Sequence, residues 1–127
     1  MDVYLTKVVL THLQALVLLS SCRDGLLIGH KQGQRYFVES VLSAPLRLTS
    51  VRTRYIQIDQ QLGNRVLGFF TLQADDKKRK SLYQPLYMGK ILLEIQASSE
   101  KGPKMKAYVV DFADRFFLSP LKLKKEK

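Results

Sequence analysis

Apolar residues near the start of the chain recur every three or four positions, which is the spacing of a helix with one buried face. The residues that form this pattern are Val9, Leu10, Leu13, Leu16, Val17 and Leu19. Thr6 precedes them at a place where a hydroxyl can cap the first turn of a helix. We therefore expect a mostly buried helix over residues 7–21, preceded by a short edge strand at residues 1–5.

Farther along, short apolar segments alternate with turn residues, and this arrangement predicts strands. Residues 26–30 and 35–42 flank a turn that contains Gly33, so we expect them to pair as a hairpin. Residues 54–59 alternate apolar and polar side chains, which is typical of a half-buried strand. Residues 66–72 are densely apolar and predict a strand in the centre of the sheet.

The second half of the chain predicts one more helix and one more hairpin. Residues 75–80 have the composition of a charged loop. Ser81 can cap a short helix that ends near Met88. Residues 90–96 and 104–111 then predict a pair of antiparallel strands.

The predicted order of elements is typical of an α/β protein with a mixed β-sheet and helices packed on it. The length of 127 residues fits a single domain. We assign residues 1–120 to this domain. Residues 121–127 form a basic C-terminal tail that we expect to be frayed.

Composition narrows the classes of partner. A formal charge of +10 favours contact with nucleic acid, an anionic surface or an acidic protein, although a basic surface also keeps a protein soluble without further function. The single cysteine, Cys22, excludes an internal disulfide and favours a reducing, cytoplasmic location. The apolar run at residues 8–19 is too short to cross a bilayer, so we expect no transmembrane segment.

Few side chains are available for catalysis. His12, His30 and Cys22 are the only histidines and cysteine in the chain. Cys22 and His30 could form a nucleophilic pair, but a cysteine that serves as a small buried hydrophobe is the more common case. The sequence therefore predicts a protein without cofactor and without catalytic residues.

Three strings resemble the MPN/JAMM domain family, whose active members are zinc-dependent isopeptidases. The strings are residues 24–30, residues 66–70, and the strand pair at residues 90–96 and 107–111. The resemblance implies the layered α/β architecture of that family, which is similar to that of cytidine deaminases. It covers residues 3–120.

The resemblance also implies where a zinc site would lie, and that this site is degenerate. The position of the family's catalytic glutamate holds Cys22, and the two histidine positions hold Thr71 and Gln73. The family's serine is matched by Ser81, whereas the aspartate ligand is replaced by Gln84. Neutral oxygen donors bind zinc poorly, so we expect no metal and no isopeptidase activity at these positions.

Two functions of different classes follow from these observations. The first is a non-catalytic interaction or scaffold module that binds a protein partner or a second copy of itself. Its docking face would lie on the first helix or around Phe116 and Phe117.

The second function is nucleic-acid binding. Four consecutive cations could contact phosphates, and two tyrosines that follow them could stack on bases. These residues are Lys77, Lys78, Arg79, Lys80, Tyr83 and Tyr87. The simpler alternative for this run is a solvated loop without a partner.

Overall fold

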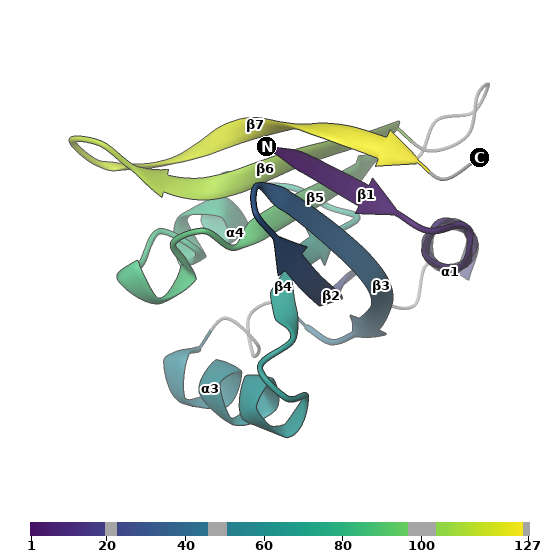
Figure 1. The fold of residues 1–127 in the computed structure, drawn as a ribbon, viewed down its shortest axis with the longest axis horizontal. Helices are drawn as coiled ribbons and strands as arrows, with labels where there is room; N and C mark the ends of the chain where they lie inside the picture. The colour runs from purple at the N-terminus through teal and green to yellow at the C-terminus, as the bar shows by residue number, and fades with distance from the viewer. Residues whose placement is uncertain (20–22, 46–50, 97–103, 126–127) are drawn as a thin grey trace.

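A computed structural model describes residues 1–19, 23–45, 51–96 and 104–125 of the chain. Within these ranges the strands form one closed barrel (Figure 1). The strands are β1 (Asp2–Leu5), β2 (Asp24–Gln32), β3 (Arg35–Ser43), β4 (Val66–Thr71), β5 (Ile91–Gln96), β6 (Lys104–Phe112) and β7 (Phe116–Lys125).

The barrel is mixed in strand direction. Around the barrel the order is β1, β3, β2, β4, β5, β6 and β7, and β7 pairs with β1 to close it. β1 runs parallel to both of its neighbours, and β4 runs parallel to β5. The remaining pairs are antiparallel, and they include the two predicted hairpins, β2–β3 and β5–β6.

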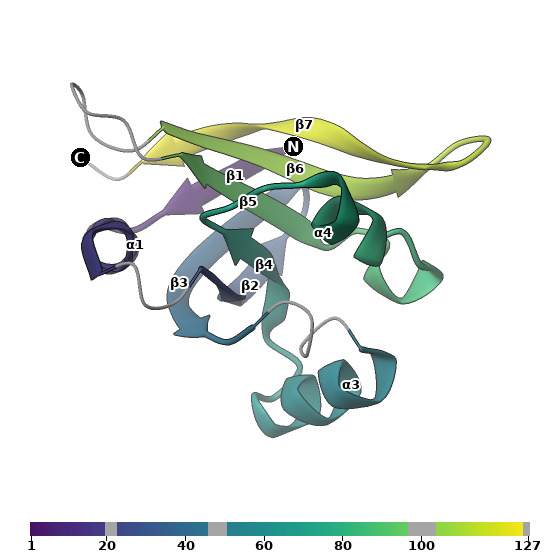
Figure 2. The same cartoon turned by 180° about the vertical axis from the view of Figure 1, so that it is seen from behind.

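The helices lie outside the barrel wall. They are α1 (Lys7–Leu19), α3 (Arg52–Gln61), α4 (Asp76–Ser81) and a 3-10 turn at Pro85–Tyr87. α1 lies beside the ends of β1 and β3, α3 lies below β4 in Figure 1, and Figure 2 shows α4 beside β5. As expected, the Thr6 hydroxyl caps α1, because its Oγ1 accepts a hydrogen bond from the Val9 N–H at 3.2 Å.

Two apolar clusters stabilise the barrel, one on each side of its wall. The interior cluster takes side chains from all strands and from α1, whose Val9, Leu13 and Leu16 contribute to it. The outer cluster lies beneath α3 and the 3-10 turn and contains Tyr55 and Tyr87. β4 contributes to both clusters, which explains why every residue of this strand is buried and why its sequence shows no alternation.

The layered α/β architecture predicted from the MPN/JAMM resemblance is wrong. The described chain is a closed barrel of seven strands with few helices, and helices do not sandwich an open sheet. The predicted edge strand at residues 1–5 also has no free edge, because β1 is paired on both sides.

The strand predicted at residues 54–59 is wrong as well, because this segment lies in α3. Tyr55 is buried, and Ile58 and Leu62 pack against the same outer cluster. Their spacing of three and four residues is helical, whereas the alternation that predicted a strand rests only on Ile56 and Ile58 with the polar residues beside them. The helix ends at a turn in which Gly63 and Asn64 have φ values of 70° and 60°.

Two predictions at charged segments also need correction. Residues 121–125 are not a frayed tail, because they belong to β7 and its end pairs with β1. Residues 76–80, predicted as a loop, lie in α4, and Ser81 is the last residue of this helix and does not cap another. Residues 97–103, which connect the two strands of the second predicted hairpin, lie outside the described residues.

Candidate functional site

A buried polar cluster lies where β2 begins and β4 ends. Asp24 and Thr71 face each other across this strand pair, and Thr71 is fully buried. Thr71 Oγ1 donates a hydrogen bond to Asp24 Oδ1 at 2.7 Å. Lys78 Nζ donates to the same Asp24 oxygen at 2.9 Å and lies 3.3 Å from Thr71 Oγ1. The cluster ties α4 to the barrel wall through the ion pair of Lys78 with Asp24 and the hydroxyl of Thr71.

Helix α4 directs a second cation inward. Its N-cap is Asp75, whose Oδ1 accepts a hydrogen bond from the Lys78 N–H at 2.7 Å. One residue farther along, Arg79 forms a bidentate ion pair with Glu94 on β5. Nε donates to Oε2 at 2.8 Å, and Nη2 donates to Oε1 at 3.1 Å. Hydrogen bonding to Glu94 raises the pKa of Arg79, so its guanidinium stays charged.

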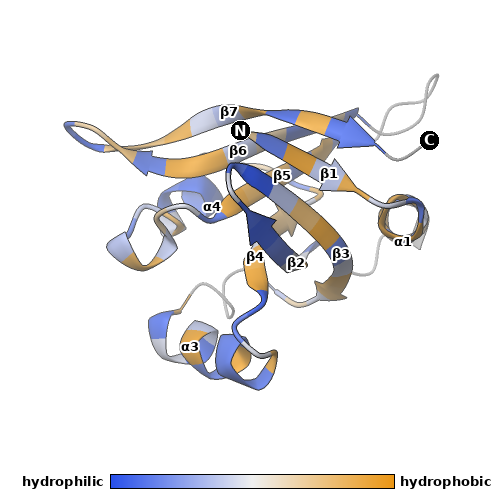
Figure 3. Cartoon of the chain, in the orientation of Figure 1, coloured by the Kyte–Doolittle hydropathy of each residue, from blue (hydrophilic) through white to orange (hydrophobic). Residues whose placement is uncertain are grey.

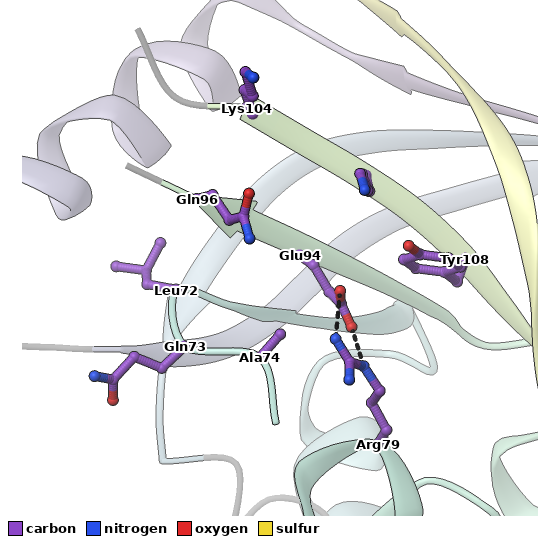
Figure 4. A pocket seen from close by; sticks show the side chains of 9 residues that line it. Leu72, Gln73, Ala74, Arg79, Glu94, Gln96, Lys104 and Tyr108 are labelled. Carbon is purple, nitrogen blue, oxygen red and sulfur yellow. Dashed lines mark hydrogen bonds and ion pairs between the residues drawn. The ribbon is translucent and has the colours of Figure 1, made fainter. Parts of the chain in front are cut away.

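A pocket of about 330 Å³ adjoins this ion pair (Figure 4). The segment after β4 forms one wall, α4 forms another, and β5 and β6 provide the remainder. Arg79 reaches into the pocket from α4, and Glu94 and Tyr108 approach it from the two strands. The lining residues are Leu72, Gln73, Ala74, Arg79, Glu94, Gln96, Lys104, Lys106 and Tyr108.

The positions predicted for a degenerate zinc site form two separate local pairs. The Gln73 N–H donates to Thr71 Oγ1 at 3.1 Å, and Gln84 Nε2 donates to the Ser81 carbonyl at 2.9 Å. Cys22 lies outside the described residues. Among the residues that the structure describes, no three histidine, cysteine, aspartate or glutamate side chains are grouped to hold a metal ion.

The basic run does not present one continuous cationic surface. Lys78 and Arg79 form ion pairs with Asp24 and Glu94 of the barrel, and only Lys77 and Lys80 remain exposed. Two of the four cations are thus paired with carboxylates of the barrel, and the run lies in helix α4 and not in a solvated loop.

The tyrosines that follow the basic run are placed by packing. Tyr87 is fully buried and lies edge-on to Tyr55 and Phe69, with centroid distances of 5.0 and 5.5 Å. Burial raises its pKa to about 12, and the ring is not accessible to a base. Tyr83 stacks on Phe116 of β7 at 6.5 Å, and this contact ties the end of α4 to the β6–β7 hairpin.

The solvent-exposed side of α1 carries a stripe that contains large apolar side chains. Val8 and Leu18 expose 74% and 84% of their surface. With the exposed Thr11 and Ala15 they form a stripe, which we call the outer stripe, at steps of three, four and three residues. This is the heptad spacing of a helix that packs against another helix. Figure 3 shows how strongly α1 is hydrophobic compared with the mostly hydrophilic α3.

No protein-family model and no curated protein matches the sequence. Solved structures resemble this chain. One of them is the solution structure of protein DSY2949 from Desulfitobacterium hafniense, with a TM-score of 0.62 and 19% sequence identity over 98% of this chain and 94% of that chain. At this identity the likeness establishes the fold and carries no information about function.

Of the residues that line the pocket, sequence reasoning singled out Gln73 and Arg79 and missed those on β5 and β6. Glu94 was the available signal, because it is the one acidic residue in an otherwise apolar strand and is nearly buried. A buried carboxylate requires a cation, and the nearby basic run could have supplied it. Lys104, Lys106 and Tyr108 then follow from alternation on β6, which places them on one face.

No helix in the described ranges has the length and apolar character needed to cross a membrane.

Proposed function

We propose that this protein is a non-catalytic interaction module that pairs with a second copy of itself through the outer stripe of α1. The observation that carries the proposal is the pair of exposed apolar side chains, Val8 and Leu18, at the two ends of the stripe. An isolated exposed apolar residue is ordinary, whereas a regular stripe at heptad spacing is typical of a helix that lacks its partner.

The stripe is arranged to match a second copy of itself. In an antiparallel pair of helices related by a two-fold axis at Leu13, Val8 faces Leu18 and Thr11 faces Ala15. The small residues at the centre allow the helix axes to approach closely, and the larger residues fill the ends. A self-complementary patch of this kind is what a two-fold interface requires.

Charge also favours a second copy on this face. The chain carries a net charge of +10, so most approaches between two copies are opposed by repulsion. From Val8 to Leu18 the helix has no lysine, arginine, aspartate or glutamate. Two copies can therefore approach along α1 without placing like charges in contact.

The experiment introduces negative charge into the stripe. We expect the wild-type protein to shift from monomer to dimer as its concentration rises in analytical ultracentrifugation. The variant Val8→Glu/Leu18→Glu should remain monomeric, because both charges would be buried without a cation in the pair. The matched control, Gln57→Glu/Gln60→Glu, adds the same charge to exposed positions of α3 and should dimerise like the wild type.

Disulfide trapping tests the antiparallel arrangement in a background that carries Cys22→Ala. In that arrangement Val8 of one copy lies near Leu18 of the other, and like positions lie about 15 Å apart along the axis. A mixture of Val8→Cys and Leu18→Cys chains should therefore form a mixed disulfide, whereas neither variant alone should form one. A wild-type protein that is monomeric at all concentrations would contradict the proposal.

A further inference from the structure

The pocket between α4, β5 and β6 provides a second candidate for binding, independent of α1. Its volume of about 330 Å³ lies at the lower end of the range for small-molecule sites, about 300–1,000 Å³. At about 30 Å³ for each water molecule, it holds a ligand of roughly ten non-hydrogen atoms. Among the described residues, Leu72 and Ala74 are the only aliphatic ones that line it, so a polar ligand fits it better than an apolar one.

The strand register places the charged lining residues on one face. Glu94 of β5 stands directly opposite Lys106 of β6, and Gln96 stands opposite Lys104. Side chains at alternate positions of a strand share a face, so both lysines and Tyr108 follow the same side of β6. This face is the floor of the pocket, and Figure 4 shows Glu94, Gln96 and Tyr108 along it.

Among the described lining residues Glu94 is the one carboxylate, and Arg79 neutralises it. Both oxygens of Glu94 accept hydrogen bonds from Arg79, at 2.8 and 3.1 Å. Asp76 accepts a further bond from Arg79 Nη1 at 3.2 Å. In the part of the chain that the structure describes, no ion pair involves Lys104 or Lys106. Their two ammonium groups leave the pocket with an excess of positive charge.

We infer that this pocket binds a small polyanion, with two or more phosphate or carboxylate groups. Lys104 and Lys106 would supply charge-assisted hydrogen bonds to it. Gln73, Gln96 and the Tyr108 hydroxyl provide neutral hydrogen-bonding groups around them. The Arg79–Glu94 pair fixes the wall between α4 and β5, so the pocket is formed before the ligand enters.

The experiment titrates the protein with sodium pyrophosphate and, separately, with sodium citrate at constant ionic strength. Amide chemical shifts from two-dimensional NMR spectra report where each anion binds. We expect saturable shifts at the pocket residues. The relative affinities for the two anions then identify phosphate or carboxylate as the preferred group. Absence of saturable binding of both anions would overturn the inference.

Two variants with opposite expected effects separate a built site from general attraction to a basic protein. Lys104→Gln/Lys106→Gln should weaken binding by about tenfold or more, because both charge-assisted bonds are lost. Arg52→Gln/Arg54→Gln removes the same charge from exposed positions of α3 and should leave the affinity unchanged. Equal weakening in both double variants would show that only net charge matters and would overturn the inference.

The third variant, Glu94→Gln, removes the negative charge from the pocket floor and leaves Arg79 without its anion. We expect binding of the preferred anion to tighten by about tenfold. Circular dichroism verifies that each variant is folded. An unchanged or weaker affinity in folded Glu94→Gln protein would contradict the electrostatic basis of the site.

Discussion

Two buried tyrosines differ in how their hydroxyl groups are satisfied. Tyr36 donates a hydrogen bond from its hydroxyl to the Gly89 carbonyl at 2.6 Å. The Tyr55 hydroxyl is buried without a hydrogen-bond partner among the described residues. Burial raises the pKa of Tyr55, so this hydroxyl stays protonated in the folded protein. A buried polar group without a partner costs stability, whereas the ring around it stabilises the outer cluster.

This difference predicts opposite effects of the same substitution. Tyr55→Phe keeps the ring contacts with Phe69 and Tyr87 and removes the unpaired hydroxyl, so we expect the free energy of unfolding to rise by about 1 kcal/mol. Tyr36→Phe removes the hydrogen bond to the Gly89 carbonyl, so we expect the free energy of unfolding to fall by about 1 kcal/mol. Urea unfolding at neutral pH measures both. A loss of stability in Tyr55→Phe would show that its hydroxyl has a partner in solution.

At the scale of elements, local sequence patterns predicted most strands but not how the strands are arranged around the barrel. Both hairpins follow from apolar segments joined by turns, and α1 follows from its period and from Thr6. The strand predicted at residues 54–59 rests on the alternation of Ile56 and Ile58 with polar residues, and this pattern is too short to exclude the helix in which Tyr55 and Ile58 share a face. The pairing of the strands also determines which side chains meet. Arg79 of α4 reaches Glu94 because β5 lies beside β4, the strand that precedes α4. The spacing of residues along the chain does not predict which strands pair.

The contact between β4 and β5 depends on one glycine. A Cβ at Gly68 would meet the backbone oxygen of Ile91 at 1.9 Å, so any side chain there separates the two parallel strands. We expect Gly68→Ala to lower the free energy of unfolding by at least about 3 kcal/mol, because the clash is with backbone that cannot turn aside.

The comparison for this substitution is Gly33→Ala in the β2–β3 turn. Gly33 has a φ of 61° and open space around its Cα, so alanine meets only backbone strain there. We expect a loss of about 1 kcal/mol, measured by the same urea unfolding. Equal losses at the two positions would show that close approach of β4 and β5 is not what requires Gly68.

At the scale of the whole molecule, closure depends on a segment that the sequence presents as a basic tail. Lysines dominate residues 122–125, and a cationic C-terminus is typical of a frayed end. In the barrel these residues pair in parallel with all of β1, Asp2 with Lys122 through to Leu5 with Lys125. Leu121 and Leu123 pack against the interior cluster and alternate with lysines. This alternation is the sequence signal that one face of the segment is buried. This pairing joins the two ends of the chain and leaves β1 without a free edge.

Removal of the residues after Leu121 tests whether this closure holds the barrel together. Truncation deletes the pairing with β1 and the Leu123 side chain, and we expect the free energy of unfolding to fall by at least about 3 kcal/mol. The matched control, Lys122→Gln/Lys124→Gln, keeps the strand and removes the exposed ion pair between Lys124 and Asp2. Its urea midpoint should stay close to that of the wild type, because exposed ion pairs add little. If the truncated chain matched the wild type instead, β7 would end before it reaches β1, and the barrel would be an open sheet in solution.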